Sequence, residues 1–221
     1  MKKTIILLII YFASCICNGQ NKMYVCDTIS TVRIVCRDAD YNKVVENGNV
    51  MNIEVFVGND KIQEITYKYE NTGAFTLKHF DLLDLNFDGY TDILISAGHT
   101  ANRHQPFFDG YLWSETEHKF ILEPQIKESM PNLLVDVDKK QIYSYYIVSN
   151  KIMYSIYKYQ QHQYKLIGEL NKLNAFDEHS KYEEMHYKND KVKKIRCKKY
   201  KNLSSKWKGV LKFIDNKSND L

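Results

Sequence analysis

Short runs of β-branched and aromatic residues, separated by turn-forming residues, recur along the chain and restrict it to a strand-rich fold. Polar and apolar residues alternate within these runs, which places the apolar side chains on one face of a strand. The expected strands span residues 28–37, 52–57, 61–69, 142–148, 152–159, 164–170, 182–187 and 191–200, and residues 204–214 are expected to add a closing strand. We therefore expect an all-β fold of antiparallel hairpins in a propeller-like or sandwich arrangement.

Turn chemistry between the runs indicates how consecutive strands pair. Gly58, Asn59 and Asp60 separate two alternating runs, and this composition favours a tight hairpin. Residues 111–123 align without gaps on residues 157–169, and each segment has the form of strand, polar turn and strand. The identical pairs are Tyr111/Tyr157, Lys119/Lys165, Ile121/Ile167 and Glu123/Glu169. This internal similarity indicates repeated hairpins.

The first residues have the pattern of an export signal and not of a strand in this fold. Lys2 and Lys3 precede an apolar run over residues 5–13, and small or polar residues follow it. The run is shorter than the roughly 20 residues that span a bilayer. We expect residues 1–19 to be a signal peptide and residues 20–221 to form a single β-rich domain.

Two processing routes stay open at the end of this signal. Cleavage after Gly19 gives a soluble exported protein, whereas the segment ending in Cys15 resembles a bacterial lipobox, whose cysteine carries a lipid anchor. Either route predicts an exported protein of the periplasm or cell envelope, and a membrane is reached only through the anchor at Cys15.

Three cysteines remain beyond the signal, and an odd number leaves at least one thiol unpaired within the chain. A disulfide between Cys26 and Cys36 is one possibility, and pairing of either with Cys197 is equally compatible with the sequence. The spacing does not match a zinc site. We assign these cysteines a structural role.

The formal net charge of +4 is modest, but lysines are concentrated in residues 188–212. Such a stretch could contact an anionic lipid or polysaccharide surface. Val192, Ile195 and Cys197 alternate with the basic residues, however, which favours a strand with one solvated basic face. Export argues against nucleic acid as a partner.

Residues 84–92 carry the most specific chemical pattern in the chain. Carboxylate or amide oxygens recur at the first, third, fifth and ninth positions, as in a calcium loop, and Gly89 permits the sharp turn. The expected metal ligands are Asp84, Asn86, Asp88, the carbonyl oxygen of Tyr90, and Asp92. The number of protein oxygens favours Ca²⁺ over the smaller Mg²⁺. Without a cation, the carboxylates would repel one another.

This loop differs from a helical EF-hand. Its twelfth position is Ile95, where an EF-hand carries a bidentate Glu, and apolar strand-like runs flank it at residues 80–83 and 93–98. The pattern therefore predicts a loop that joins two strands, with Asp92 and water in place of the missing Glu. Such a site is expected to hold the fold together and not to sense calcium.

The signature Asn-Phe-Asp-Gly-Tyr-x-Asp at residues 86–92, followed by an apolar strand, a Tyr-Leu-Trp strand and a Lys-Phe strand, resembles exported bacterial FG-GAP-like proteins related to periplasmic inhibitors of I-type lysozyme. The resemblance covers residues 81–122 and implies a propeller-like arrangement of hairpins. It also implies calcium binding by Asp84, Asn86, Asp88, Tyr90 and Asp92. Those inhibitors plug the enzyme cleft with a Ser-Gly loop, which residues 96–99 only approximate.

Other candidate sites have less specific patterns. His99 and His104 frame a loop and could form a small metal or acid–base site with Asp109, although solvated loop histidines are the simpler interpretation. Trp113 could present an aromatic surface, but its alternation with Tyr111 favours the core. Common nucleophile, phosphate-binding and metalloprotease motifs are absent from the sequence, so we do not expect an enzyme.

Three functions are compatible with these features. The first is an exported calcium-binding module that binds a protein or glycan of the cell envelope, with a lysozyme-like hydrolase as one candidate target. The second is a surface module that binds glycans or part of a secretion apparatus. The third is a carbohydrate-active enzyme, because paired carboxylates are brought together in space and not in sequence.

Overall fold

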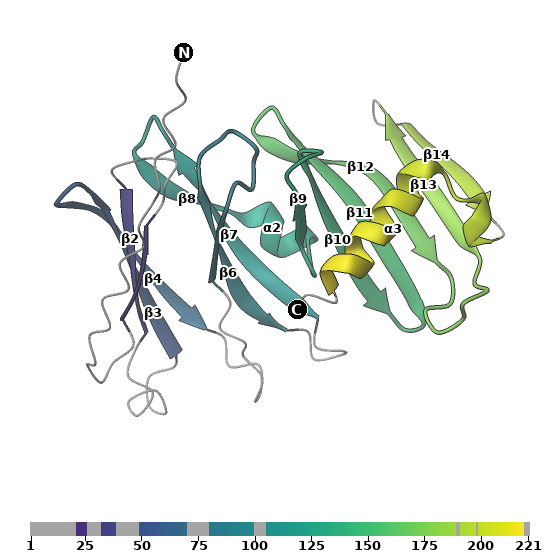
Figure 1. Ribbon diagram of the computed structural model, residues 1–221, viewed down its shortest axis with the longest axis horizontal. Helices are drawn as coiled ribbons and strands as arrows, with labels where there is room; N and C mark the ends of the chain where they lie inside the picture. Colours follow the sequence, from purple (N-terminus) through teal and green to yellow (C-terminus); the bar gives the residue numbers. More distant parts are fainter. Residues whose placement is uncertain are drawn as a thin grey trace, which may run out of the picture.

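The computed structural model describes residues 21–25, 32–38, 49–69, 80–99, 105–188, 191–197 and 199–218. Residues 1–19, Cys26 and His104 lie outside the described residues, so the predictions that concern them stay predictions. Three antiparallel sheets make up most of the described chain, and strands that follow one another in sequence are neighbours within each sheet (Figure 1). The predicted all-β fold of antiparallel hairpins is confirmed.

The first sheet shows how the predicted turn chemistry acts. It contains β1 (Asn21–Val25), β2 (Val32–Asp38), β3 (Asn49–Val57) and β4 (Asp60–Tyr69) in that order. Val57 pairs with Asp60 across Gly58 and Asn59. The φ angle of Gly58 is 61°, a left-handed value that glycine adopts readily. The predicted hairpin at residues 58–60 is therefore confirmed.

The second sheet carries the Asp-rich loop. It contains β5 (Phe80–Leu83), β6 (Asp92–His99), β7 (Pro106–Ser114) and β8 (Lys119–Glu123), and the short helix α2 (Pro124–Ser129) follows. Pro stands in the first turn of α2, where its missing N–H has no helical partner to lose. Glu123 caps this helix by accepting a hydrogen bond from the backbone N–H of Gln125 at 3.1 Å.

The third sheet is larger and ends with a helix. Its strands are β9 (Leu134–Asp136), β10 (Gln141–Val148), β11 (Lys151–Gln160), β12 (Gln163–Lys172), β13 (Tyr182–Lys188) and β14 (Lys191–Cys197). A 3-10 turn, η2 (Tyr200–Asn202), leads into α3 (Ser205–Ser218). The aligned segments at residues 111–123 and 157–169 do form corresponding hairpins, β7–β8 and β11–β12.

The predicted closing strand at residues 204–214 is wrong, because this segment forms α3. Its buried apolar residues are Trp207, Val210, Leu211 and Ile214, and their spacing of three and four residues is helical. The hydroxyl oxygen of Ser204 accepts a hydrogen bond from the backbone N–H of Trp207 at 3.4 Å, near the start of the helix. The mixture of lysines and large apolar residues resembles the polar–apolar alternation of a strand. The residues that are actually buried, however, recur with the period of a helix.

The three sheets follow one another in a row along the molecule (Figure 1). The cluster between the first and second sheets contains Val32, Ile34, Ile53, Val55, Ile93, Ile95, Trp113 and Phe120. The cluster between the second and third sheets contains Leu85, Leu94, Phe108, Leu112, Ile126, Met130, Leu133, Ile142, Tyr157 and Tyr164. Along β6, Ile93 and Ile95 therefore face the first sheet and Leu94 faces the third. A sheet covered on both faces explains why this strand is apolar at consecutive positions.

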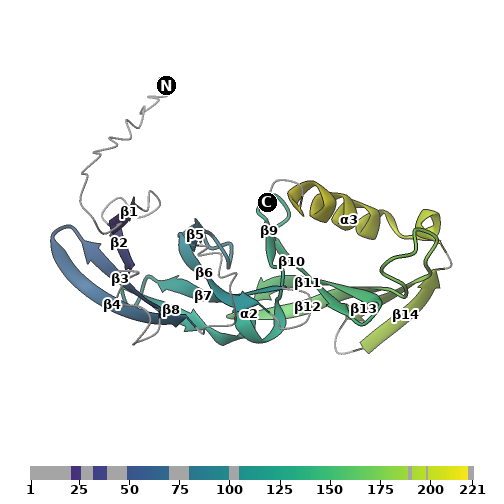
Figure 2. The same ribbon diagram turned by 90° about the horizontal axis from the view of Figure 1, so that it is seen from below.

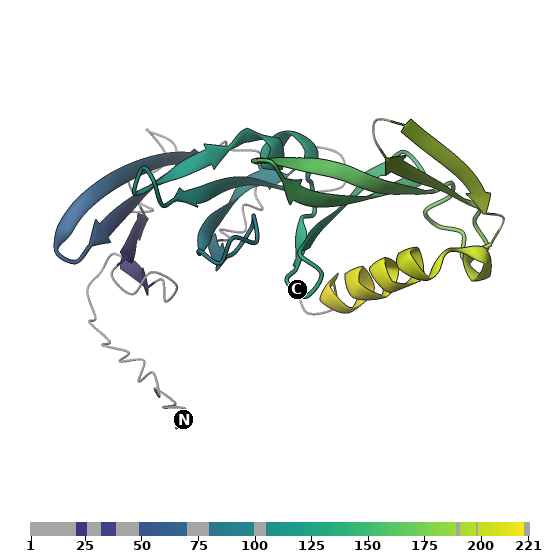
Figure 3. The ribbon, with the colours of Figure 1, turned by 90° about the horizontal axis from the view of Figure 1, so that it is seen from above.

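Helix α3 covers one face of the third sheet (Figure 2 and Figure 3). The cluster beneath it contains Tyr143, Ile156, Leu170, Tyr182, Leu203, Trp207, Val210, Leu211 and Ile214. Among the described residues no helix is long and apolar enough to cross a membrane.

Among the described residues, three glutamine side chains join neighbouring sheets, each by bonding to both the N–H and the carbonyl oxygen of a single residue in the other sheet. Gln63 of β4 donates to the carbonyl of Phe120 and accepts from its N–H, both at 2.8 Å. Gln105 makes the same pair of bonds with Ile147 of β10, at 3.0 and 2.6 Å. Gln125 of α2 does so with Tyr164 of β12, at 2.6 and 2.9 Å. Each carboxamide therefore makes the same pair of hydrogen bonds that a residue of a neighbouring strand would make, at a place where two sheets meet.

The row of sheets also limits the disulfides. Cys36 lies on β2 and Cys197 on β14, and these strands stand at opposite ends of the molecule (Figure 1). Cysteines joined by a disulfide have Cα atoms within about 7 Å of each other. A Cys36–Cys197 disulfide within one chain, one of the pairings that the sequence leaves open, is therefore excluded by the separation of the two strands.

Candidate functional site

The Asp-rich segment connects β5 to β6, as its apolar flanks predicted. Leu83 pairs with Asp92 at the base of the connection. Within it, the φ angles of Phe87 and Gly89 are 64° and 95°, so the backbone turns sharply at two places. Glycine adopts such values without strain, which agrees with the role expected for Gly89. The segment is a strand-to-strand loop and not the entry to a helix.

The polar side chains of the loop fold inward onto its own backbone. The carboxylate of Asp84 accepts hydrogen bonds from the N–H groups of Asp88 at 3.1 Å and Gly89 at 2.9 Å. The amide oxygen of Asn86 accepts from the same Asp88 N–H at 3.1 Å, so oxygens of Asp84 and Asn86 lie close together. Asp88 in turn accepts from the N–H of Tyr90 and the side-chain amide of Asn86, both at 2.8 Å.

Asp92 lies beneath the loop and is fully buried. Its two carboxylate oxygens accept hydrogen bonds from the backbone N–H of Leu85 at 2.7 Å and of Trp113 at 2.8 Å. Burial raises the pKa of Asp92 to about 7, and the charges of Asp88 and Asp84 add to this rise while the two N–H groups oppose it. Among the described residues no lysine or arginine side chain forms an ion pair with Asp92.

Leu85 ties the loop to the third sheet. Its side chain is buried in the cluster between the second and third sheets. Its N–H donates to Asp92, and its carbonyl oxygen accepts a hydrogen bond from the hydroxyl of Tyr164 on β12 at 3.1 Å. The ring of Tyr164 packs edge-on against that of Tyr159, with 4.8 Å between ring centroids. The loop is therefore fixed to strands of both sheets.

The residues predicted to bind calcium are brought together in part. Asp84, Asn86 and Asp88 share one turn of backbone, whereas the Asp92 carboxylate is set back in the core and already accepts two N–H bonds. Carboxylate oxygens retain further lone pairs, and oxygen is the donor that Ca²⁺ prefers, so the donor chemistry fits the ion. In the described part of the chain, no group of three or more His, Cys, Asp and Glu side chains is arranged to hold a metal by itself.

The other predicted site residues lie apart from the loop. Asp109 is buried on β7, with Lys127 of α2 at 3.6 Å. Ser96 is buried within β6, and the pairing of β6 with β7 shifts register between Ser96 and Gly98. The segment that resembles an inhibitory Ser-Gly loop therefore begins inside a strand. Trp113 is buried against Phe120 with 5.1 Å between ring centroids, as the alternation on its strand predicted.

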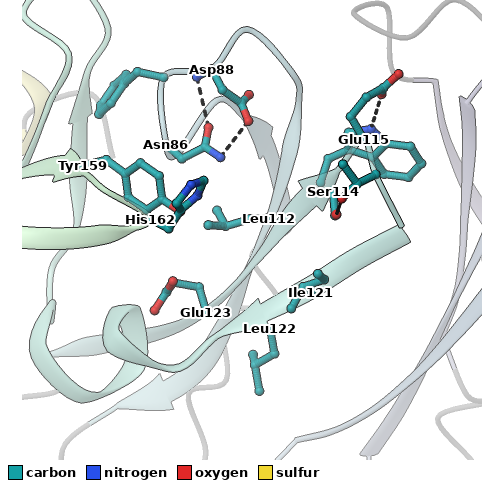
Figure 4. A pocket seen from close by; sticks show the side chains of 13 residues that line it. Asn86, Asp88, Leu112, Ser114, Glu115, Ile121, Leu122, Glu123, Tyr159 and His162 are labelled. Atoms are coloured by element: carbon teal, nitrogen blue, oxygen red, sulfur yellow. Dashed lines mark hydrogen bonds between the residues drawn. The ribbon is translucent and has the colours of Figure 1, made fainter. Parts of the chain in front are cut away.

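A cavity of about 460 Å³ adjoins the Asp-rich loop (Figure 4). Its wall residues come from that loop, from the β7–β8 hairpin and from the β11–β12 hairpin. They are Asn86, Phe87, Asp88, Leu112, Trp113, Ser114, Glu115, Thr116, Ile121, Leu122, Glu123, Tyr159 and His162. Sequence patterns give no signal for this cavity, because three segments distant in the chain have to be packed together to form it.

Comparison of the chain with protein-family models gives no match, and comparison with curated proteins gives no significant match. A solved structure described as a Xanthomonas type IV secretion system related protein is similar in fold. The TM-score is 0.54 at 14% sequence identity, over 77% of this chain and 92% of the other. At this identity the likeness establishes a shared fold.

Proposed function

We propose that this chain is an exported calcium-binding module of the cell envelope, in which the ion stabilises the junction of the second and third sheets. The buried carboxylate of Asp92 carries this proposal, because it lies beneath Asp84 and Asp88 and no lysine or arginine among the described residues pairs with it. A calcium ion held by Asp84, Asn86, Asp88, the carbonyl oxygen of Tyr90 and Asp92 would supply the missing positive charge.

The energetic consequence is a fold that depends on the ion. A ligand that binds only the native state stabilises it by about 3–4 kcal/mol at 100 to 1,000 times its dissociation constant. Leu85 and Tyr164 link the loop to the third sheet, so this stabilisation reaches beyond the loop. The ion has a structural role in this proposal and does not take part in a reaction.

Calorimetric titration with calcium, combined with thermal unfolding, tests the metal site. Wild type should bind one ion and melt at a higher temperature in calcium than in excess chelator. Asp88→Ala should lose both effects, whereas Asp138→Ala should keep them, because Asp138 is an exposed carboxylate in a turn away from the loop. Loss of stability by Asp88→Ala that is equal in calcium and in chelator would reject the site.

Two kinds of partner suit a module of this type. The resemblance of residues 81–122 to FG-GAP-like proteins that are related to lysozyme inhibitors favours a lysozyme-like hydrolase. Purified protein should then slow cell-wall lysis by at least one lysozyme class. The fold shared with a Xanthomonas protein that is related to a type IV secretion system favours a component of a secretion apparatus. A secretion component would be retained from envelope extracts by the wild type and lost on chelation, without any effect on lysozymes.

Export itself is testable at the two processing routes. Radiolabelled palmitate should enter the protein if Cys15 is lipidated, and Cys15→Ser should abolish the label. Mass spectrometry of the mature protein should instead find Gln20 at the N-terminus if cleavage follows Gly19. A protein that keeps residues 1–19 in the cytoplasmic fraction would contradict export by either route.

A further inference from the structure

The cavity beside the Asp-rich loop has an apolar floor. Leu112 and Ile121 are paired across β7 and β8, so their side chains stand on the same face of the hairpin. Ile121 keeps 40% of its surface exposed, which is high for a large apolar residue on a strand. Tyr159 closes one end of the cavity from β11 (Figure 4). The floor is therefore apolar and has an aromatic ring beside it.

Carboxylates surround this apolar floor. Glu123 lies on one side of Leu112, and Asn86 and Asp88 lie on the other (Figure 4). Glu115 is also part of the wall, where it accepts a hydrogen bond from the indole N–H of Trp113 at 3.2 Å. No lysine or arginine is among the wall residues that the structure describes.

We propose that this cavity binds an arginine side chain presented by a peptide segment of a partner protein. This inference rests on the proposed role as a binding module and specifies the chemistry that the partner presents. The aliphatic part of the arginine would lie over Leu112 and Ile121, and its guanidinium would pair with the carboxylate of Glu123. The ring of Tyr159 adds a face on which a guanidinium can stack.

Charge and shape favour a peptide over a sugar as the occupant. Trp113 is only 4% exposed and its ring packs against Phe120, so its ring offers no open face on which a sugar could stack. Glu115 and Glu123 are not among the proposed calcium ligands, and in a wall without lysine or arginine among its described residues they favour a cation as the occupant. Arginine matches this wall better than lysine, because its planar group can pair with a carboxylate and stack on a ring at once.

Amide chemical-shift perturbation by a defined peptide tests the proposal. The probe is a blocked pentapeptide with one arginine between alanines, and the matched control carries citrulline, which keeps the shape and lacks the charge. The arginine peptide should shift amides around Leu112, Glu123, Tyr159 and His162, and the effect should weaken as salt is added. The citrulline peptide should leave these amides unchanged.

Two variants distinguish binding in the cavity from a general attraction of the peptide to the acidic surface. Glu123→Gln keeps the oxygen that accepts the Gln125 N–H and loses the charge, so it should weaken peptide binding about tenfold with the fold intact. Glu117→Gln removes the same charge from the exposed turn of the hairpin, where Glu117 pairs with Lys119 and does not line the cavity. Binding to Glu117→Gln should equal that of the wild type.

Several outcomes would overturn the proposal. They are equal shifts with citrulline, equal weakening by both variants, and stronger shifts of the same amides by a trimer of N-acetylglucosamine, which would assign the cavity to a glycan. Calcium added without peptide tests the loop separately, through the amides of residues 84–92. A missing calcium response rejects the metal site and leaves the peptide result standing, whereas a missing peptide response rejects only this inference.

Discussion

Asp92 and Asp136 are buried aspartates of different sheets. The surroundings of Asp92 disfavour its negative charge, whereas those of Asp136 favour it. Asp92 starts β6 and accepts two backbone N–H bonds, and burial raises its pKa to about 7. Asp136 ends β9 and accepts bonds from the ammonium of Lys139 at 2.9 Å and the hydroxyl of Tyr143 at 2.8 Å. Burial opposes ionisation of Asp136 too, but these bonds and the Lys139 charge hold its pKa below the ordinary value.

The difference shows which buried carboxylate is compensated by the protein itself and which would be stabilised by a bound cation. The charge of Asp136 is balanced by Lys139, so the turn between β9 and β10 needs nothing further. Burial and the charges of Asp88 and Asp84 disfavour a negative charge on Asp92, and the two backbone N–H groups offset this only in part. A buried carboxylate in this position is destabilising when ionised, unless a cation binds nearby.

The largest expected effect is an opposite response of the two sites to pH. A raised pKa in the folded state means that Asp92 favours folding most below its ordinary pKa of 3.8, and this contribution is lost as pH rises toward about 7. In chelator, the free energy of unfolding should fall over that window by up to about 4 kcal/mol from this group. Asp136 acts in the other direction, adding stability above its ordinary pKa and losing it as pH falls through the lowered value.

Urea unfolding across pH 4 to 8, in chelator and in calcium, measures how the free energy of unfolding depends on pH. The reference is Asp92→Asn, in which this position no longer titrates. The difference between wild type and Asp92→Asn isolates the contribution of Asp92. Saturating calcium should flatten the wild-type profile, because the ion holds the carboxylate in its charged form. A difference profile that does not change with pH would show that Asp92 is ionised throughout and adequately solvated.

Removing the cation from Asp136 should make it resemble Asp92. Lys139→Met keeps most of the aliphatic stem and deletes the ammonium, so the pKa of Asp136 should rise. We expect a loss of about 1–2 kcal/mol at pH 7, less than for a fully buried pair because the Lys139 side chain is 53% exposed. Lys140→Met is the control, since Lys140 is exposed in the same turn and forms no ion pair among the described residues. Equal losses in both variants would assign the effect to the turn backbone.

The sequence predicts the loop that carries Asp92, but it does not predict the burial of this residue. Spacing of oxygens over residues 84–92, with Ile95 in place of a bidentate Glu, predicted a loop between two strands, because both signals are local. Burial of Asp92 under that loop was not predictable, since it depends on Leu85 and Trp113 approaching from different elements.

Helix α3 and the cavity are the other differences between prediction and structure. Residues 204–214 contain lysines that suggest strand alternation, but four buried residues packed against the third sheet select a helix. The wall of the cavity unites Asn86, Glu123 and Tyr159, which are far apart in the chain. The helix does have a local pattern, the spacing of Trp207, Val210, Leu211 and Ile214 by three and four residues, whereas the cavity has none.

The smallest expected effect is the loss of stability on removing one tyrosine hydroxyl from each site. Tyr164 bonds to Leu85 of the loop, and Tyr143 bonds to Asp136. Tyr164→Phe leaves the buried carbonyl of Leu85 without its hydroxyl donor and should reduce the free energy of unfolding by about 1–2 kcal/mol. Tyr143→Phe should lose about 1 kcal/mol or less, because Lys139 still bonds to Asp136. Urea unfolding measures both.

Calcium distinguishes the two tyrosine variants beyond their stability. Leu85 is held by Asp92 on one side and by Tyr164 on the other, so loss of the hydroxyl loosens the start of the loop. The rise in melting temperature on adding calcium should therefore be smaller in Tyr164→Phe than in wild type, and unchanged in Tyr143→Phe. Equal calcium responses in the two variants would mean that the loop is positioned by its internal bonds alone, and that its attachment to the third sheet contributes to stability but not to the proposed metal site.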